Sequence, residues 1–179
     1  MNYKSKETIG IIFAIIAYFS FSILDTIQKS AVLYYSIFQL LLIKYIFVLL
    51  LSILEARRTK NVTFYKSKNL KLQIIRSLLS ILESGFFVLS FKYLSLANAH
   101  SIGALAPIII VVLSVFILNE RVSIKTWVAI FIGFIGVLII IRPGSDVFTI
   151  KSFIPLTAAF FLGLYQIATK KMTEYDTPE

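Results

Sequence analysis

Six long apolar stretches, joined mostly by short polar connections, constrain this sequence more than any motif in it. They cover about residues 9–27, 31–54, 70–91, 97–118, 124–141 and 153–169. A helix needs roughly 17–25 mostly apolar residues to cross the hydrocarbon core of a bilayer. Of the 179 residues, 58% are hydrophobic and only 15% are charged, which is too apolar for an ordinary soluble domain. The sequence therefore predicts an all-α, polytopic transmembrane helical bundle with six spans.

The basic residues between the predicted spans are divided unequally between the two sides of the membrane. If the spans alternate in direction, one side carries 12 Lys and Arg residues and the other side carries 4. Because Lys and Arg are enriched in cytoplasmic loops, both termini of this chain are predicted to be cytoplasmic, in a multi-pass protein of the cell's inner (plasma) membrane. The same charges lie in the gaps between apolar runs, so the net charge of +9 does not indicate nucleic-acid binding.

Residue types that carry most enzyme chemistry are scarce in this chain. It has no cysteine and one histidine, and Asp25 and Glu83 are the acidic residues within the predicted spans. A thiol nucleophile is therefore excluded, and a metal cluster would need more carboxylates. We expect no metal, no other cofactor and no enzymatic activity. An intramembrane hydrolase would need a serine and a lysine that meet in one cavity.

One face of the predicted third span is polar, because Arg76, Ser80 and Glu83 lie about one or two turns apart. Glu83 lies ~18–20 Å from the cytoplasmic end of its helix, near the middle of a ~30 Å hydrocarbon core. Lys44 has a similar depth on the antiparallel second span, whereas Arg76 is close enough to the interface to extend toward water. We predict that Lys44 and Glu83 form a buried pair lining a central cavity, although a purely structural ion pair would give the same pattern.

Several polar or helix-breaking residues lie nearer the outer face of the membrane. Asp25 and Lys29 are four residues apart on the first span and are interpreted as a paired interfacial anchor. Gln39 is a further candidate for a buried polar residue. His100 is either an ordinary solvated histidine or part of the cavity. Pro107 lacks a backbone donor in the fourth span, which predicts a kink or break there, as is common beside transporter cavities.

Small residues at four-residue spacing occur on two predicted spans. Ser80 and Ser84 form one pair, and Ala129 and Gly133 form another, with Gly136 about one turn further on. Small side chains let neighbouring helices approach closely in a membrane. We interpret both pairs as packing positions within the chain rather than as a dimer motif.

The stretch APIIIVVLSVFILNERVSIKTWVAIFIGFIGVLIIIRPG, residues 106–144, resembles the EamA family of the drug/metabolite transporter superfamily. The matching pieces are Pro107, Asn119-Glu120-Arg121, Trp127, Gly133, Gly136 and Arg142-Pro143-Gly144. Arg76 and the segment FKYLSLANAHSIGALAP are also similar to this family, so the resemblance covers roughly residues 9–144. Taken alone, Glu120 and Arg121 would be interpreted as solvated charges at a helix end.

The resemblance implies ten spans arranged as two inverted repeats of five. Residues 1–144 would then form the first repeat, residues 145–152 a loop, and residues 153–179 the first span of an incomplete second repeat. The chain is therefore expected to be truncated relative to the family, and the rest of the cavity would come from a C-terminal repeat or from a homodimer.

The family's activity implies an integral membrane permease that moves a small organic metabolite by alternating access. Its expected partners are the lipid bilayer and a small-molecule solute. The residues expected to line the substrate cavity are Lys44, Arg76, Glu83, His100 and Pro107. The alternative is a non-transporting membrane module, or a half-transporter that acts only as an assembled oligomer.

Overall fold

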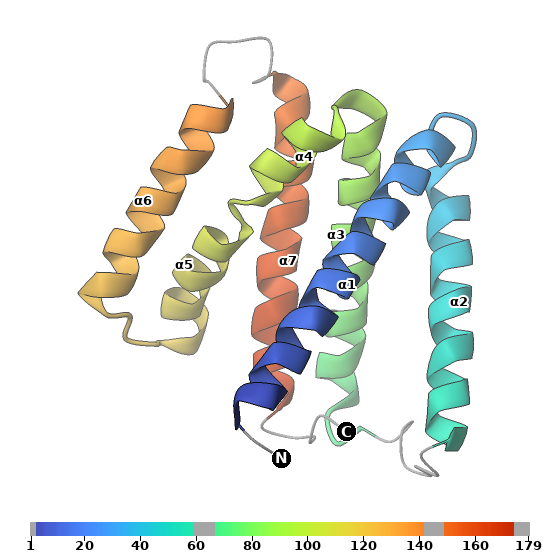
Figure 1. The fold of residues 1–179 in the computed structure, drawn as a ribbon, viewed down its shortest axis with the longest axis horizontal. Coiled ribbons are helices and arrows are strands. Elements are labelled where there is room, and N and C mark those ends of the chain that lie inside the picture. The colour runs from blue at the N-terminus through green and yellow to red at the C-terminus, as the bar shows by residue number, and fades with distance from the viewer. Residues whose placement is uncertain (1–2, 59–66, 142–148, 174–179) are drawn as a thin grey trace.

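The computed structural model describes residues 3–58, 67–141 and 149–173, which form a bundle of helices without a strand (Figure 1). The elements are α1 (Tyr3–Ala31), α2 (Ile37–Arg58), α3 (Leu70–Tyr93), α4 (Leu96–Gly103), α5 (Ala106–Leu118), α6 (Ile124–Ile141), the 3-10 helix η1 (Ile150–Ser152) and α7 (Phe153–Met172). In these ranges α1, α2, α3, α4 with α5, and η1 with α7 give five apolar segments long enough to cross a membrane. Helix α6 is apolar but shorter. The predicted all-α transmembrane bundle is confirmed.

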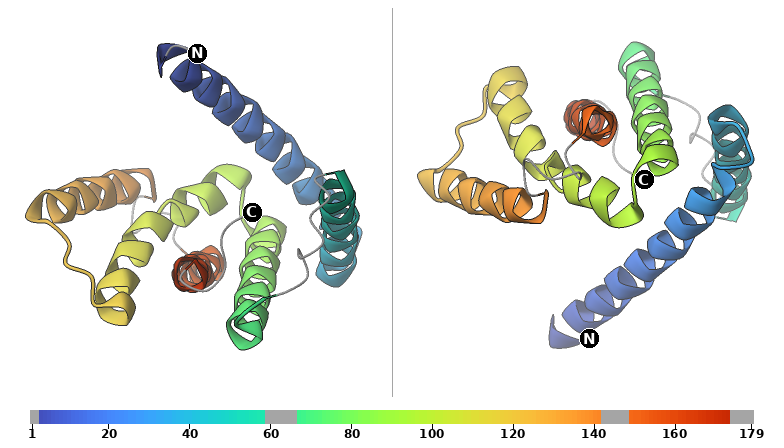
Figure 2. Two further views of the ribbon diagram at one scale, coloured as in Figure 1. Left: turned by 90° about the horizontal axis from the view of Figure 1, so that it is seen from below. Right: turned by 90° about the horizontal axis from the view of Figure 1, so that it is seen from above.

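Helix α7 is the centre of the bundle. It packs along α3 and α5 and also contacts α4, and it is the most buried of the membrane-length segments. The end-on views in Figure 2 show α3, α4 and α5 curving around α7, with α2 beyond α3 and α6 beyond α5. The buried face of α7 includes Ala158, Ala159 and Gly163, and these small residues let its neighbours approach closely.

Helix α1 is attached to the bundle near one end only. Gln28 on α1 and Val32 just after it are buried, whereas the side chains of residues 8–24 are all exposed. Figure 2 shows the N-terminal part of α1 pointing away from the other helices. The apolar core to which α1 attaches lies where α3 ends and α4 begins. Its buried members are Val32, Val88, Phe91, Leu94, Ala99, Ile102 and Val137.

Short polar side chains fix where three of the helices begin. At α2, Ser36 and Gln39 cap each other's backbone N–H groups at 3.3 and 3.0 Å. Asn69 accepts from the Leu72 N–H at the start of α3, and Ser95 accepts from the Asn98 N–H at the start of α4. Gln39 is exposed, so its prediction as a buried polar residue was wrong: its amide is used to begin a helix.

The fourth predicted span is interrupted between α4 and α5, as Pro107 predicted. Helix α4 ends at Gly103, and α5 begins at Ala106 with the proline in its first turn, where the missing N–H costs little. The Ala104 N–H donates to the His100 carbonyl at 2.9 Å, which closes the last turn of α4. The break therefore leaves α4 as a separate eight-residue helix.

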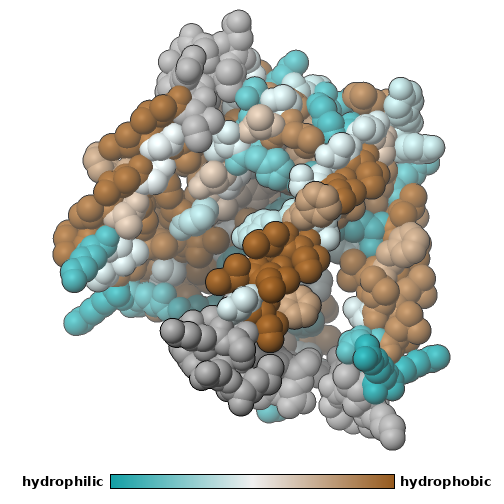
Figure 3. Space-filling model, viewed as in Figure 1, coloured by the Kyte–Doolittle hydropathy of each residue, from teal (hydrophilic) through white to brown (hydrophobic). Residues whose placement is uncertain are grey.

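The basic residues gather at one end of the bundle, called here the basic end. It is the lower end in Figure 1, where α2, α5 and α7 finish and α3 and α6 begin. Its described basic residues are Arg57, Arg58, Lys68, Lys71, Arg121, Lys125, Lys170 and Lys171. Lys29, Lys92 and Lys151 lie toward the opposite end. Figure 3 shows mostly apolar side chains over the middle of one face, with hydrophilic ones gathered toward its two ends.

The small residues that were predicted to pack against neighbouring helices do so on α3 but not on α6. Ser80 and Ser84 lie against α2, where each makes a polar contact. A methyl group added at Gly133 or Gly136 would meet no atom within 4 Å among the described residues. The prediction that these glycines pack within the chain was therefore wrong. The tight glycine is Gly163, because a Cβ there would lie 2.9 Å from Leu113 Cδ1 and 3.1 Å from Ile109 Cγ2.

We expect Gly163→Val to destabilise the protein by roughly 1–3 kcal/mol, because the added side chain overpacks the α5–α7 contact. In detergent, the thermal midpoint should fall by roughly 2–4 °C for each kcal/mol lost. Gly133→Val is the matched control, since open space surrounds that glycine. Equal thermal midpoints for the two variants would contradict this account of the packing.

Candidate functional site

A chain of three polar side chains connects α2 and α3 within their membrane-length segments. Lys44 Nζ donates to Ser84 Oγ at 2.9 Å, and Ser84 Oγ donates to Glu83 Oε2 at 3.1 Å. A serine hydroxyl can accept one hydrogen bond while it donates another, so this arrangement satisfies all three groups. Ser84 is buried, and Lys44 and Glu83 are half-buried. Two groups that carry opposite charges are therefore joined through one hydroxyl.

This geometry corrects the predicted Lys44–Glu83 pair. Glu120 forms a direct ion pair with Lys170, and the Asp25 carboxyl group contacts His100, whereas Lys44 and Glu83 both bind Ser84. Lys44 and Glu83 do lie close to each other. The Ser84 side chain points from α3 toward α2, so its hydroxyl lies between the two groups and bonds both. Sequence reasoning treated Ser84 only as a small packing residue. Its position directly after an intramembrane glutamate was the signal for a polar role.

Two further side chains extend the polar contact between α2 and α3. The Tyr45 hydroxyl lies 3.5 Å from Ser80 Oγ, and Lys44 Nζ lies 5.7 Å from the centre of the Tyr45 ring. A cation at this distance is attracted to the face of an aromatic ring. We call Lys44, Tyr45, Ser80, Glu83 and Ser84 the inner polar cluster.

A second polar contact joins α1 to α4 near the end of the bundle opposite the basic end. Asp25 Oδ2 lies 3.1 Å from His100 Nε2, and the two side chains are 17% and 51% exposed. The Phe87 ring lies edge-on to the His100 ring, with the centroids 5.2 Å apart. We call Asp25 and His100 the outer pair. Since Phe87 follows Glu83 by one turn on α3, its ring lies between the outer pair and the inner polar cluster.

Lys29 does not act as the predicted partner of Asp25. Its Nζ donates to the backbone carbonyls of Phe91 and Leu94, the latter at 2.8 Å. These carbonyls belong to the C-terminal end of α3, where the helix dipole favours a cation. Lys29 therefore anchors α1 on the end of α3, and Asp25 is left to bind His100.

The other predicted cavity residues are not part of these contacts. Arg76 is half-buried and lies about one turn from Ser80, toward the basic end. Pro107 is exposed at the start of α5. The structure thus joins Lys44 and Glu83 through Ser84, places His100 beside Asp25, and leaves Arg76 and Pro107 outside both groups.

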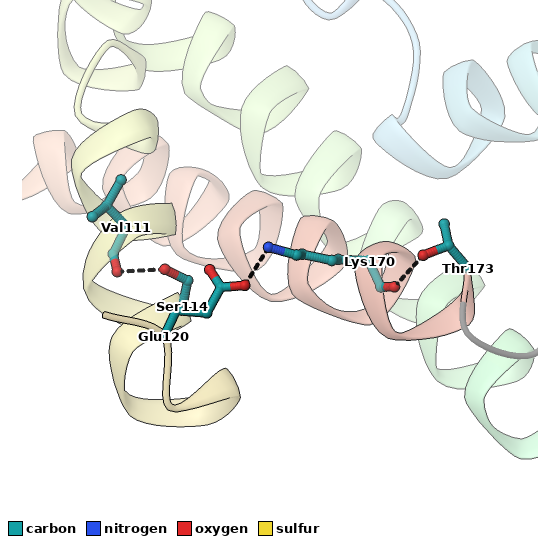
Figure 4. A network of polar contacts seen from close by, with 5 residues as sticks. All are labelled: Val111, Ser114, Glu120, Lys170 and Thr173. Atoms are coloured by element: carbon teal, nitrogen blue, oxygen red, sulfur yellow. Dashed lines mark hydrogen bonds and ion pairs between the residues drawn. The ribbon is translucent and has the colours of Figure 1, made fainter. Parts of the chain in front are cut away.

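A third polar contact, missed from the sequence, ties the α5–α6 connection to the end of α7 (Figure 4). Glu120 forms an ion pair with Lys170, and its N–H donates to the Ser114 carbonyl at 3.4 Å. Asn119 has a left-handed backbone, φ 52°, which ends α5 and turns the chain toward α7. Glu120 is therefore a solvent-exposed charge, 36% exposed, that also pairs with Lys170.

The arrangement places a lysine and a glutamate within the membrane-length segments of an apolar bundle. Charged side chains within membrane spans are rare because leaving water is costly, and they commonly mark solute or ion pathways. The inner polar cluster offers an amino donor, a carboxyl acceptor, three hydroxyls and an aromatic face. Such a set can bind a polar organic molecule without a metal or a covalent step.

The known proteins that this chain resembles include membrane transporters. Residues 8–142 match the EamA-like transporter family. A riboflavin transporter of Vibrio cholerae is 43% identical over 61 residues, which are 34% of this chain and 20% of that protein. An uncharacterized transporter of Helicobacter pylori is 26% identical over 168 residues, 93% of this chain and 56% of that protein.

A third relative is an S-adenosylmethionine uptake transporter of Rickettsia bellii, 26% identical over 115 residues, 62% of this chain and 40% of that protein. The matches thus span between a fifth and just over half of these relatives' lengths. No solved structure matches this chain. Because the family match covers most of the chain and includes the helices that carry both polar groups, the chain belongs to the EamA-like transporter family.

Proposed function

We propose that this chain is part of a permease that moves a small organic metabolite across the membrane by alternating access. The observation that carries this proposal is the hydrogen-bonded chain Lys44–Ser84–Glu83 between the membrane-length segments of α2 and α3. If its role were only structural, apolar residues of similar volume would pack these helices without the cost of burying charge. The fold is a scaffold for transport and carries out no bond chemistry.

The relatives and the cluster together support a proposal for the solute class. Relatives carry the names riboflavin transporter and S-adenosylmethionine uptake transporter. Both of these metabolites carry a nitrogen-rich aromatic ring and hydroxyl groups. In this chain Lys44 and Glu83 would bind acceptors and donors on such a ring, and the Tyr45 ring would stack against its face. Arg76, His100 and Pro107 would line the same path further from the cluster.

The orientation and the missing part of the pathway are also proposals. The basic end would face the cytoplasm. The N-terminal end of α1 and the C-terminal end of α7 would then both lie at the cytoplasmic interface of an inner membrane. Residues 1–144 would form one five-span repeat, residues 145–152 a loop, and residues 153–179 the start of a second repeat. The remaining wall of the cavity would come from a C-terminal repeat or from a second copy of the chain.

Ser84→Ala should lower the free energy of unfolding by about 1–3 kcal/mol, because Lys44 loses its acceptor and Glu83 its donor. Ser77→Ala on the same helix is the control, since Ser77 is exposed. The measurement is thermal unfolding of both variants in one detergent. If Ser84→Ala were as stable as Ser77→Ala, the hydroxyl would not join the two charged groups.

Uptake of radiolabelled riboflavin and S-adenosylmethionine, measured separately in cells that lack their own carriers, tests the proposed function. For the solute that is transported, Lys44→Met and Glu83→Gln should each reduce uptake about tenfold or more, because each removes a charged hydrogen-bonding group. Lys92→Gln, an exposed change toward the opposite end, should transport normally.

The amount of folded protein in the membrane is measured for each variant, so that loss of uptake is not confused with loss of protein. Normal uptake by both Lys44→Met and Glu83→Gln would show that the inner polar cluster is not part of the solute pathway. Absence of uptake by the folded parent protein, for both solutes and in the presence of a C-terminal repeat, would favour a non-transporting membrane module.

A further inference from the structure

Helices α1 and α7 run in opposite directions through the bundle. Helix α1 begins at the basic end, and α7 finishes there (Figure 1). Under the two-repeat organisation proposed above, they are the first spans of two repeats with inverted topology. Helix α7 nevertheless lies among the helices of the first repeat. It packs against α3, which is the third span, and against α4 and α5, which together make the fourth span.

Helix α1 has no such groove around it within the described residues. It is the least buried of the membrane-length segments, and the side chains of residues 8–24 are exposed. Inverted repeats are related by a two-fold axis in the membrane plane, and contacts across a two-fold axis are reciprocal. The contact of α7 with the first repeat should therefore have a counterpart, in which α1 contacts the second repeat.

The sequence of α1 supports this correspondence. Its residues 17–29, AYFSFSILDTIQK, align without a gap with residues 158–170 of α7, AAFFLGLYQIATK. The identical pairs are Ala17 and Ala158, Phe19 and Phe160, and Lys29 and Lys170. In this alignment Ser22 takes the place of Gly163, the glycine on α7 that is packed most tightly against α5. A small residue therefore occupies the position on α1 where a neighbouring helix would come closest.

The surface of α1 also has a hollow at the matching place. It has a volume of about 360 Å³ and is lined by Thr26, Ile27, Ser30, Ala31 and Tyr34. In the same alignment, positions 26, 27 and 31 of α1 correspond to positions 167, 168 and 172 of α7. Those three residues of α7 are buried by its neighbours. The hollow on α1 thus lies where the corresponding part of α7 is covered.

From this correspondence we propose that α1 is the docking surface for a second repeat, and that it inserts between the third and fourth spans of that repeat. A second copy of this chain would not offer such a groove, because its own α7 already fills the space between α3 and α5. The Helicobacter pylori relative is long enough to contain the repeat, since 93% of this chain matches only 56% of that protein. The proposal rests on the proposed two-repeat organisation and on no particular solute.

The absence of cysteine from this chain allows single spin labels to test the proposal. Ser22→Cys and Phe19→Cys each carry one nitroxide, and its accessibility to oxygen is measured in a bilayer. In this chain alone, both positions should be highly accessible. The C-terminal half of the Helicobacter pylori relative, produced in the same cells, should lower the accessibility at position 22 to that of a label at the buried Val88. Position 19 should stay accessible, because Phe160 is 44% exposed on α7.

A change in size at the docking surface gives a second test. Ser22→Leu should leave the thermal midpoint of this chain alone unchanged, because Ser22 is exposed. It should reduce co-purification of the Helicobacter pylori half about tenfold or more, because the larger side chain overpacks a close helix contact. Phe19→Leu is the matched control and should co-purify that half normally. The two halves of the Helicobacter pylori protein, produced separately, are the positive control for assembly.

Three results would overturn the proposal. One is assembly with the Helicobacter pylori half while position 22 stays as accessible as position 19. Another is failure of this chain to bind that half although the relative's own two halves assemble. The third is low accessibility at position 22 in this chain alone, which would show that its own helices or a second copy cover the surface. Neither experiment measures uptake, so docking can be confirmed where transport is absent, and transport can be confirmed where docking fails.

Discussion

The structure depends on the cost of placing ionised side chains among apolar helices. In hydrocarbon, Lys44 and Glu83 must each find a polar partner, and Ser84 supplies one to both. This requirement fixes how α3 is turned about its axis, with Ser84 toward the bundle and residues such as Ile81 exposed on its surface. The same rotation directs Phe87 toward His100 and so relates the inner polar cluster to the outer pair.

The described helices include a tightly packed group and one loosely attached helix, α1. Helix α7 packs closely against α3 and α5. The side chains of Leu113 and Ile109 on α5 lie next to the space that a side chain at Gly163 would occupy. Helix α1 is instead held near its C-terminal end, where Gln28 and Val32 are buried and Lys29 donates to the Phe91 and Leu94 carbonyls. It is the least buried of the membrane-length segments, whereas Ala99 and Ile102 pack α4 into the core.

Features that depend on composition and on helical periodicity could be predicted from the sequence. Contacts that depend on the direction in which a side chain points could not. The spans, the polar face of α3 and the break at Pro107 follow from hydrophobic runs, helical spacing and a missing backbone donor. The targets of Lys29 and Glu120 could not be read from spacing, because their partners are 65 and 50 residues away. The cap at Gln39 was available from the sequence, since serine three residues before glutamine is a helix-start pattern.

The central claim is that the polar face of α3 is turned toward protein and away from acyl chains. Spin labels placed singly along α3 in a bilayer test it, because oxygen dissolved in lipid broadens the signal of lipid-facing labels. The account predicts low oxygen accessibility at Ser80 and Ser84 and high accessibility at Leu78 and Ile81. High accessibility at position 84 with low accessibility at position 81 would contradict it.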